Sequence, residues 1–156
     1  MKTQQTKRQG QLIPVLDDPN VQMAIFRDAA RFEDLMLLVI CIYFTPQSRS
    51  HLFLNLFSDI LSFNQRIEIL KNLPFKKRPK SLECIHTIQL VQRLRNHMAH
   101  RAMITRKKTD ITAESRVREL FSNYPRSYEL AVWKANKQLH RIGAMKEVLQ
   151  YHLGGP

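Results

Sequence analysis

The stretch Arg93–Arg101 gathers three arginines, two histidines and one asparagine within nine residues. Successive residues of a helix are about 100° apart, so Arg95, Asn96 and His100 share one face. Ala99 lies within the same face and leaves room between its larger neighbours. A guanidinium offers a planar fork of donors to phosphate oxygens, and an imidazole can give or take a proton near neutral pH. This face therefore carries groups suited to a phosphodiester.

The run Arg95-Asn96-His97-Met98-Ala99-His100 resembles the Arg-x(4–6)-His signature of the HEPN family (higher eukaryotes and prokaryotes nucleotide-binding), in its Arg-Asn-x-x-x-His form. The resemblance extends over residues 20–152, because the order of expected helices is also similar. It implies an all-α bundle and a metal-independent RNA endonuclease, a hydrolase that is often a toxin, an antiviral defence effector or a CRISPR effector domain. It also implies a homodimer with a composite active site, and an inhibitory partner such as an antitoxin.

The resemblance implies a mechanism in which the ribose 2′-hydroxyl attacks the adjacent phosphate, leaving a 2′,3′-cyclic phosphate and a free 5′-hydroxyl. His100 would act as general base or acid, a role worth about 10² to 10⁴ in rate. Arg95 would stabilise the charge that develops on phosphorus, and Asn96 completes the expected catalytic set. DNA lacks the attacking hydroxyl, so we expect it to bind without being cut.

Charge agrees with an anionic partner. The 156-residue chain has 25 Lys and Arg against 13 Asp and Glu, a formal net charge of +12. Such a surface attracts polyanions, although a basic surface alone is often only a solvated one. Beyond the catalytic set, the weaker RNA contacts that we expect are His97, Arg93, Arg101, Lys107 and Lys108.

Several other side chains have two interpretations. Phe121, Tyr124 and Tyr128 could stack on bases, but we favour packing against the core, and we assign Trp133 to the core as well. Three carboxylates that could orient His100 are more simply surface charges, namely Glu33, Asp34 and Glu68. We expect no metal or other cofactor, because neither an H-E-x-x-H motif nor clustered acids accompany the histidines.

Two other functions share the composition. In one, Arg95 and His100 grip phosphate in a non-catalytic RNA-binding or partner-binding HEPN module. The other is a small DNA-binding regulator, which requires two short helices joined by a turn, and we find no such motif.

The elements that must position this site are helical. With 4 Gly and 7 Pro, the chain has few turn residues for many strands, and its residue types favour helix. We expect a flexible basic lead over residues 1–16 and a single domain of about four to six helices over 17–156. The capping residues and apolar periodicity predict helices over 19–44, 62–73, 82–103 and 126–153, an apolar stretch over 51–61, and a short helix before Tyr124-Pro125. The box Ser62-x-x-Gln65 starts the second helix, Ser81 caps the third, and Gly154 and Gly155 close the last.

Location follows from two negative features. Cys41 and Cys84 form neither a disulfide framework nor a zinc-ligand pattern, so we expect buried, reduced thiols in a cytoplasmic protein. No secretory signal is evident, and the longest apolar run, Leu35–Phe44, is too short to span a bilayer, so we expect no membrane anchor.

Overall fold

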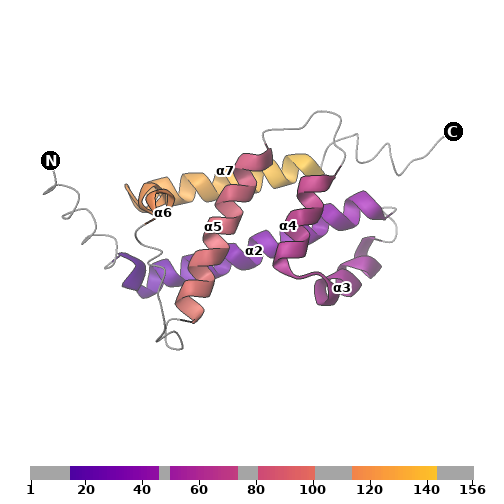
Figure 1. Cartoon of the computed structure of the whole chain (residues 1–156), viewed down its shortest axis with the longest axis horizontal. Coiled ribbons are helices and arrows are strands. Elements are labelled where there is room, and N and C mark those ends of the chain that lie inside the picture. The colour runs from indigo at the N-terminus through magenta and orange to yellow at the C-terminus, as the bar shows by residue number, and fades with distance from the viewer. Residues whose placement is uncertain (1–14, 46–49, 74–80, 101–113, 144–156) are drawn as a thin grey trace, which may run out of the picture. The chain divides into compact units, whose positions relative to one another are not determined.

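A computed structural model of the chain describes residues 15–45, 50–73, 81–100 and 114–143 (Figure 1). All regular secondary structure in these ranges is helical, and none of their residues lies in a strand, so the all-α prediction is confirmed. The helices are α2 (Pro19–Phe44), α3 (Ser50–Ile60), α4 (Phe63–Asn72), α5 (Ser81–Ala99), α6 (Ser115–Leu120) and α7 (Arg126–Gly143).

The chain divides into two compact units, each built from two separate segments. The first unit falls within Met1–Ala29 and Thr87–Trp133, and the second within Ala30–His86 and Lys134–Pro156. The division lies inside α2, α5 and α7, so each of these helices contributes residues to both units. The basic lead was predicted over residues 1–16, but residues 15–17 are helical and Leu16 is buried. Residues 1–14 lie outside the described ranges.

The start of α2 agrees with the prediction from the capping residues. The Asp18 carboxylate accepts a hydrogen bond from the backbone N–H of Asn20 at 2.8 Å, so Asp18 caps the helix that Pro19 begins. The predicted range of 19–44 matches the observed helix.

The capping box of α4 is formed as predicted. Ser62 Oγ accepts from the backbone N–H of Gln65 at 3.4 Å, and the backbone N–H of Ser62 donates to Gln65 Oε1 at 2.8 Å. The two bonds satisfy orphan donors at this helix end.

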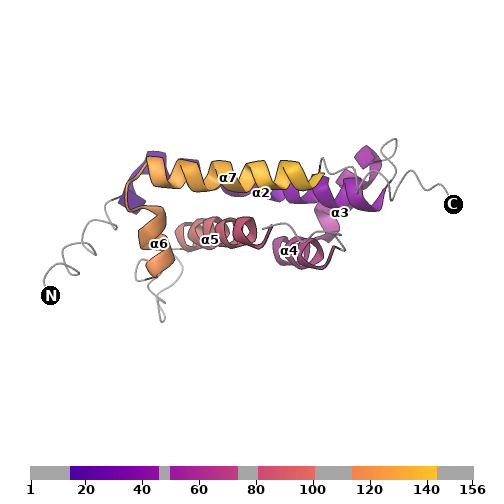
Figure 2. The same cartoon turned by 90° about the horizontal axis from the view of Figure 1, so that it is seen from above.

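The later helices agree with the prediction where they are described. Ser81, expected as an N-cap, is itself the first residue of α5. The short helix before Tyr124-Pro125 is α6, and Figure 2 shows it lying crosswise to the start of α7. The prediction extended α5 to residue 103, but the observed helix ends at Ala99 and His100 lies in a turn. Residues 101–103, the predicted extension of α7 to residue 153, and Gly154 and Gly155 lie outside the described residues.

Each unit has its own apolar core. In the first unit, the side chains that are at most 2% exposed are Val21, Ile25, Ala29, Ile88, Val91, Leu94 and Val117. In the second unit, the corresponding side chains are Phe32, Met36, Ile40, Cys41, Ile67, Cys84, Ala135 and Leu139. The prediction that both cysteines are buried thiols is confirmed, since both are free and buried.

Trp133 is not a core residue, and that prediction is wrong. Its side chain is 54% exposed, because the buried face of α7 runs through Tyr128, Val132 and Leu139. Residue 133 is about 100° further around the helix than residue 132, and so points away from that face. By contrast, Phe121 and Tyr128 are buried and stack on each other with ring centroids 5.4 Å apart, which confirms packing as their role.

A buried arginine joins three segments of the second unit. Arg66 is 8% exposed. Its Nε donates to the Leu61 carbonyl at 2.9 Å, Nη2 to the Ser58 carbonyl at 3.0 Å, and Nη1 to the Glu33 carbonyl at 3.2 Å. The carbonyls of Ser58 and Leu61 lie at the end of α3, where a helix leaves acceptors without intrahelical donors. Arg66 therefore fastens α4 to the end of α3 and to α2.

The described helices include none that combines the length and the apolar character needed to cross a bilayer.

Candidate functional site

The predicted site lies on the last turns of α5, in the first unit. Leu94 is 1% exposed and anchors this part of the helix in the core. Exposure to solvent increases over the next two residues, since Arg95 is half-buried and Asn96 is exposed. Met98 is half-buried. One side of α5 thus packs against the core of the first unit, while the other side is exposed to solvent.

Arg95 and Asn96 are in direct contact. Arg95 Nη1 donates a hydrogen bond to Asn96 Oδ1 at 3.3 Å. A guanidinium has five N–H donors, and this bond uses one of them. The Asn96 side chain therefore restrains the orientation of the Arg95 guanidinium.

His100 follows Asn96 by one helical turn. The backbone N–H of His100 donates to the Asn96 carbonyl at 3.0 Å, which continues the helical hydrogen-bond pattern past Ala99. Ala99 and His100 are both exposed. Within the part of the chain that the structure describes, no hydrogen bond or ion pair engages the His100 imidazole.

Arg93, an expected RNA contact, is engaged within the protein. Its Nη1 lies 2.9 Å from Glu114 Oε1, and the two side chains are 51% and 32% exposed. Glu114 is the N-cap residue of α6, so the ion pair links α5 to α6 inside the first unit. Any RNA phosphate would compete with this carboxylate for Arg93.

Of the other residues expected to contact RNA, only one lies in the described part of the chain. His97 is half-buried on α5. Arg101, Lys107 and Lys108 lie outside the described residues. The end of a helix is in itself a favourable place for cationic side chains, because its free carbonyls carry partial negative charge.

Of the carboxylates weighed as orienters of His100, Glu68 has a clear structural role of its own. Its Oε1 lies 2.7 Å from Lys71 Nζ in an exposed pair on α4. Asp34 is exposed, and the backbone carbonyl of Glu33 accepts from Arg66. All three residues belong to the second unit, whereas His100 belongs to the first.

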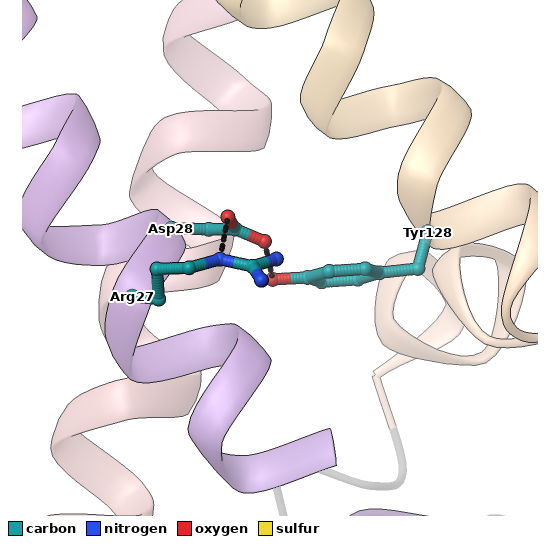
Figure 3. A network of polar contacts seen from close by, with 3 residues as sticks. All are labelled: Arg27, Asp28 and Tyr128. Carbon is teal, nitrogen blue, oxygen red and sulfur yellow. Dashed lines mark hydrogen bonds and ion pairs between the residues drawn. The ribbon is translucent and has the colours of Figure 1, made fainter. Parts of the chain in front are cut away.

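Sequence reasoning missed a buried carboxylate in the first unit (Figure 3). Asp28 is 4% exposed; its Oδ2 accepts from the Tyr128 hydroxyl at 3.0 Å and its Oδ1 from Arg27 Nε at 3.2 Å. Burial, and secondarily the negative charge of Asp28, raises the pKa of Tyr128 above its ordinary value, so the phenol stays a hydrogen-bond donor. The signal was present in the sequence, since Asp28 shares the register of Ile25 and Phe32.

The described residues contain no cluster of three or more His, Cys, Asp or Glu side chains placed to hold a metal ion. Burial raises the pKa of the Cys84 thiol to about 11, and it raises the pKa of the Cys41 thiol as well. Both thiols therefore stay protonated at neutral pH, which is the inert form of cysteine.

Comparison with known proteins yields no match: neither a protein-family model, nor a curated protein, nor a solved structure is similar to this chain. The resemblance to HEPN domains therefore stays a prediction that depends on residues 95–100 and on the helical order.

Proposed function

We propose that the protein is a metal-independent RNA endonuclease of the HEPN type. The observation that supports this most is the exposed end of α5, where the Arg95 guanidinium is hydrogen-bonded to Asn96 and the His100 imidazole follows one turn later. These are the three groups that the Arg-Asn-x-x-x-His signature requires, and they lie at the surface, where a polymer can reach them.

In the proposed reaction, Arg95 binds the non-bridging oxygens of the scissile phosphate while Asn96 holds the guanidinium in place. An imidazole removes the proton of the ribose 2′-hydroxyl, whose oxygen attacks phosphorus. The bond to the 5′-oxygen breaks, and that oxygen takes up a proton. The products are a 2′,3′-cyclic phosphate and a 5′-hydroxyl, and no metal takes part. Positive charge on Arg95 stabilises the pentavalent phosphorane.

The proposal includes the biological setting that the family implies. Two protomers would pair through their α5 ends, so that two imidazoles serve as base and acid in one composite site. A cytoplasmic toxin or antiviral effector of this kind needs restraint, which an inhibitory partner protein would supply.

One observation favours a second candidate, a non-catalytic RNA-binding or partner-binding module. A catalytic imidazole is commonly oriented by a hydrogen bond to its other nitrogen. Within the described residues His100 has no such bond, although a partner protomer or the bound RNA could provide one. As a module, Arg95 and His100 would grip phosphate without breaking the chain.

Incubation of the purified chain with mixed RNA in EDTA, followed by chemical mapping of the ends, tests the two candidates. The nuclease yields 2′,3′-cyclic phosphate ends, and Arg95→Ala and His100→Ala each abolish cleavage. His140→Ala is the matched control, because His140 is also an exposed histidine near the end of a helix, α7. Intact RNA with salt-sensitive binding supports the module instead. Equal cleavage by His100→Ala contradicts the nuclease proposal and points to a contaminating enzyme.

A further inference from the structure

Helix α7 carries the largest positive charge of the described helices. Its 18 residues include four Lys or Arg and one Glu, a formal charge of +3, whereas no other described helix exceeds +1. All five of these charged side chains are exposed. Because the opposite face of the helix is buried through Val132, Leu139 and Ile142, the charge is confined to the outward face of α7.

The one tryptophan of the chain lies on the same outward face. Trp133 is 54% exposed, although aromatic side chains bury more apolar area than most others when they pack. At about 100° per residue, Trp133, Leu130 and the four cations fall within an arc of about 100°, and Glu129 lies outside it. We call this set the α7 stripe, and its residues are Arg126, Leu130, Trp133, Lys134, Lys137 and Arg141.

The cations stand on both sides of the indole along the helix axis. Arg126 precedes Trp133 by about two turns, Arg141 follows it by about two turns, and Lys137 follows it by one. With a rise of 1.5 Å per residue, Arg126 and Arg141 are about 22 Å apart along the axis. Since α7 is one continuous helix (Figure 2), the helix itself sets these spacings. The stripe is therefore a linear series of cations with an aromatic ring near its middle.

A single strand of nucleic acid complements both features of the stripe. Lys and Arg bind phosphates, exposed aromatic rings stack on bases, and proteins that hold single strands combine the two. At about 3.4 Å per nucleotide, a length of about 22 Å spans about six nucleotides, within the range of about 4–16 for such sites. In a duplex the base faces are covered by neighbouring bases, so Trp133 would find no base to stack on.

Two other anionic partners fit the stripe less well. A helix that binds an anionic membrane inserts its apolar face into the lipid, but the apolar face of α7 is buried in the protein, which leaves only Leu130 and Trp133 in the stripe. An acidic protein would have to bury Lys134 and Lys137, and lysine is depleted in protein interfaces.

We propose that the α7 stripe is a binding site for single-stranded nucleic acid, in which phosphates contact the four cations and one base stacks on Trp133. The stripe lies on a different helix from the proposed catalytic residues at the α5 end. The proposal does not depend on ribonuclease activity, because binding at α7 requires neither Arg95 nor His100.

The intrinsic fluorescence of the protein tests the proposal directly, because all of its indole emission comes from Trp133. The probe is oligodeoxythymidine of about twelve nucleotides, which the proposed reaction cannot cut because DNA lacks the 2′-hydroxyl. We expect saturable quenching of Trp133 fluorescence by the probe. Four phosphate contacts on a single strand predict a log–log salt slope of roughly −3. The same strand in a duplex should leave the fluorescence largely unchanged.

Anisotropy of a labelled probe measures the affinity of variants that lack the indole. Trp133→Ala should weaken binding about fivefold or more through the loss of one stacked base, whereas Trp133→Phe should retain most of the affinity. Phe44→Ala is the matched control and should bind like the wild type. Phe44 is also an exposed helical aromatic residue, at 55%, and residues 32–44 of α2 contain neither Lys nor Arg.

A charge variant tests the stripe without altering the indole. Lys137→Gln should reduce the magnitude of the salt slope by about 0.7, the contribution of one phosphate contact. Lys71→Gln, on α4, removes the same charge from a lysine that is paired with Glu68, and should leave the slope unchanged. Circular dichroism checks that each variant is folded.

Three results would overturn the proposal. The first is the absence of binding, or binding that leaves Trp133 fluorescence unquenched, which would mean that the strand binds elsewhere. The second is equal affinity of Trp133→Ala and Phe44→Ala. The third is quenching by polyglutamate as strong as that by oligodeoxythymidine, which would indicate a surface for acidic proteins. RNA cleavage is not measured in any of these experiments, so their failure leaves the nuclease proposal unaffected.

Discussion

The Tyr128 hydroxyl donates a hydrogen bond to Asp28 Oδ2 at 3.0 Å, joining α7 to α2 across 100 residues of sequence. Both side chains are buried, and the only other group bound to the Asp28 carboxylate in the described chain is Arg27, whose own side chain is 73% exposed. The Tyr128 hydroxyl is therefore the buried hydrogen-bond donor to the buried Asp28 carboxylate.

Removing the phenol oxygen should weaken the fold measurably. Tyr128→Phe leaves Asp28 buried with one hydrogen bond fewer, and we expect the free energy of unfolding to fall by about 1–3 kcal/mol. Urea denaturation followed by circular dichroism measures the change. Tyr124→Phe is the matched control, since Tyr124 belongs to the same aromatic cluster and shows no hydroxyl hydrogen bond in the described chain. Equal effects of the two substitutions would contradict the role given to Asp28.

Arg66 should be among the residues most sensitive to substitution in the second unit. Arg66→Met keeps much of the side-chain volume but leaves the carbonyls of Leu61, Ser58 and Glu33 without this donor. We expect a loss of about 2–4 kcal/mol in the free energy of unfolding. Arg66→Lys should recover only part of this loss, because one ammonium cannot match the planar fork. Arg31→Met, at an exposed position of α2, should change stability by less than about 0.5 kcal/mol.

Alkaline pH should destabilise the protein through Cys84. Its folded-state pKa of about 11 exceeds the ordinary value of 9.0, so folding favours the protonated thiol. The resulting stabilisation is complete below pH 9 and is lost as the pH rises through 11; two pKa units correspond to about 2–3 kcal/mol. Denaturation curves at several pH values should show a steeper fall between pH 9 and 11 for the wild type than for Cys84→Ala. Parallel curves would rule out Cys84 as the cause.

The ion pair between Arg93 and Glu114 should restrain RNA binding. Glu114→Gln releases the guanidinium, so we expect tighter binding of single-stranded RNA and a log–log salt dependence steeper by about one phosphate contact. Stability should change by less than about 1 kcal/mol, because the pair is partly exposed. Fluorescence anisotropy over a range of salt concentrations measures both quantities. An unchanged salt slope would show that Arg93 does not reach the RNA even when released.

The helix boundaries were predictable because their signals are local. Two helix starts are marked by motifs of at most four residues. These motifs are the two aspartates followed by Pro19 at the start of α2, and the capping box of Ser62 and Gln65 at the start of α4. The contacts of Asp28 with Tyr128, Arg66 with Glu33, and Arg93 with Glu114 join positions 100, 33 and 21 residues apart, and no local pattern specifies which distant group each will meet.

The shared face of Arg95, Asn96 and His100 was predicted from helical periodicity, the structure adds the hydrogen bond between Arg95 and Asn96, and the catalytic role of the three residues stays a prediction. Helical periodicity placed Arg95, Asn96 and His100 together, while the Arg95–Asn96 bond depends on rotamers that sequence does not determine. Trp133 was misassigned to the core, because its register on α7 places it on the exposed side of that helix. The buried charges of Asp28 and Arg66 were not predicted, since their hydrogen-bond partners lie up to 100 residues away in the sequence.

The discontinuous make-up of the first unit has a consequence for synthesis on the ribosome. The opening half of α2 emerges early, but its partners begin at Thr87, and Tyr128 is translated 100 residues after Asp28. At typical elongation rates of about 5–20 residues per second, the apolar side of this half-helix waits on the order of 5–20 s for its packing partners. A nascent chain of this protein is thus an expected client of chaperones that hold exposed apolar segments until translation is complete.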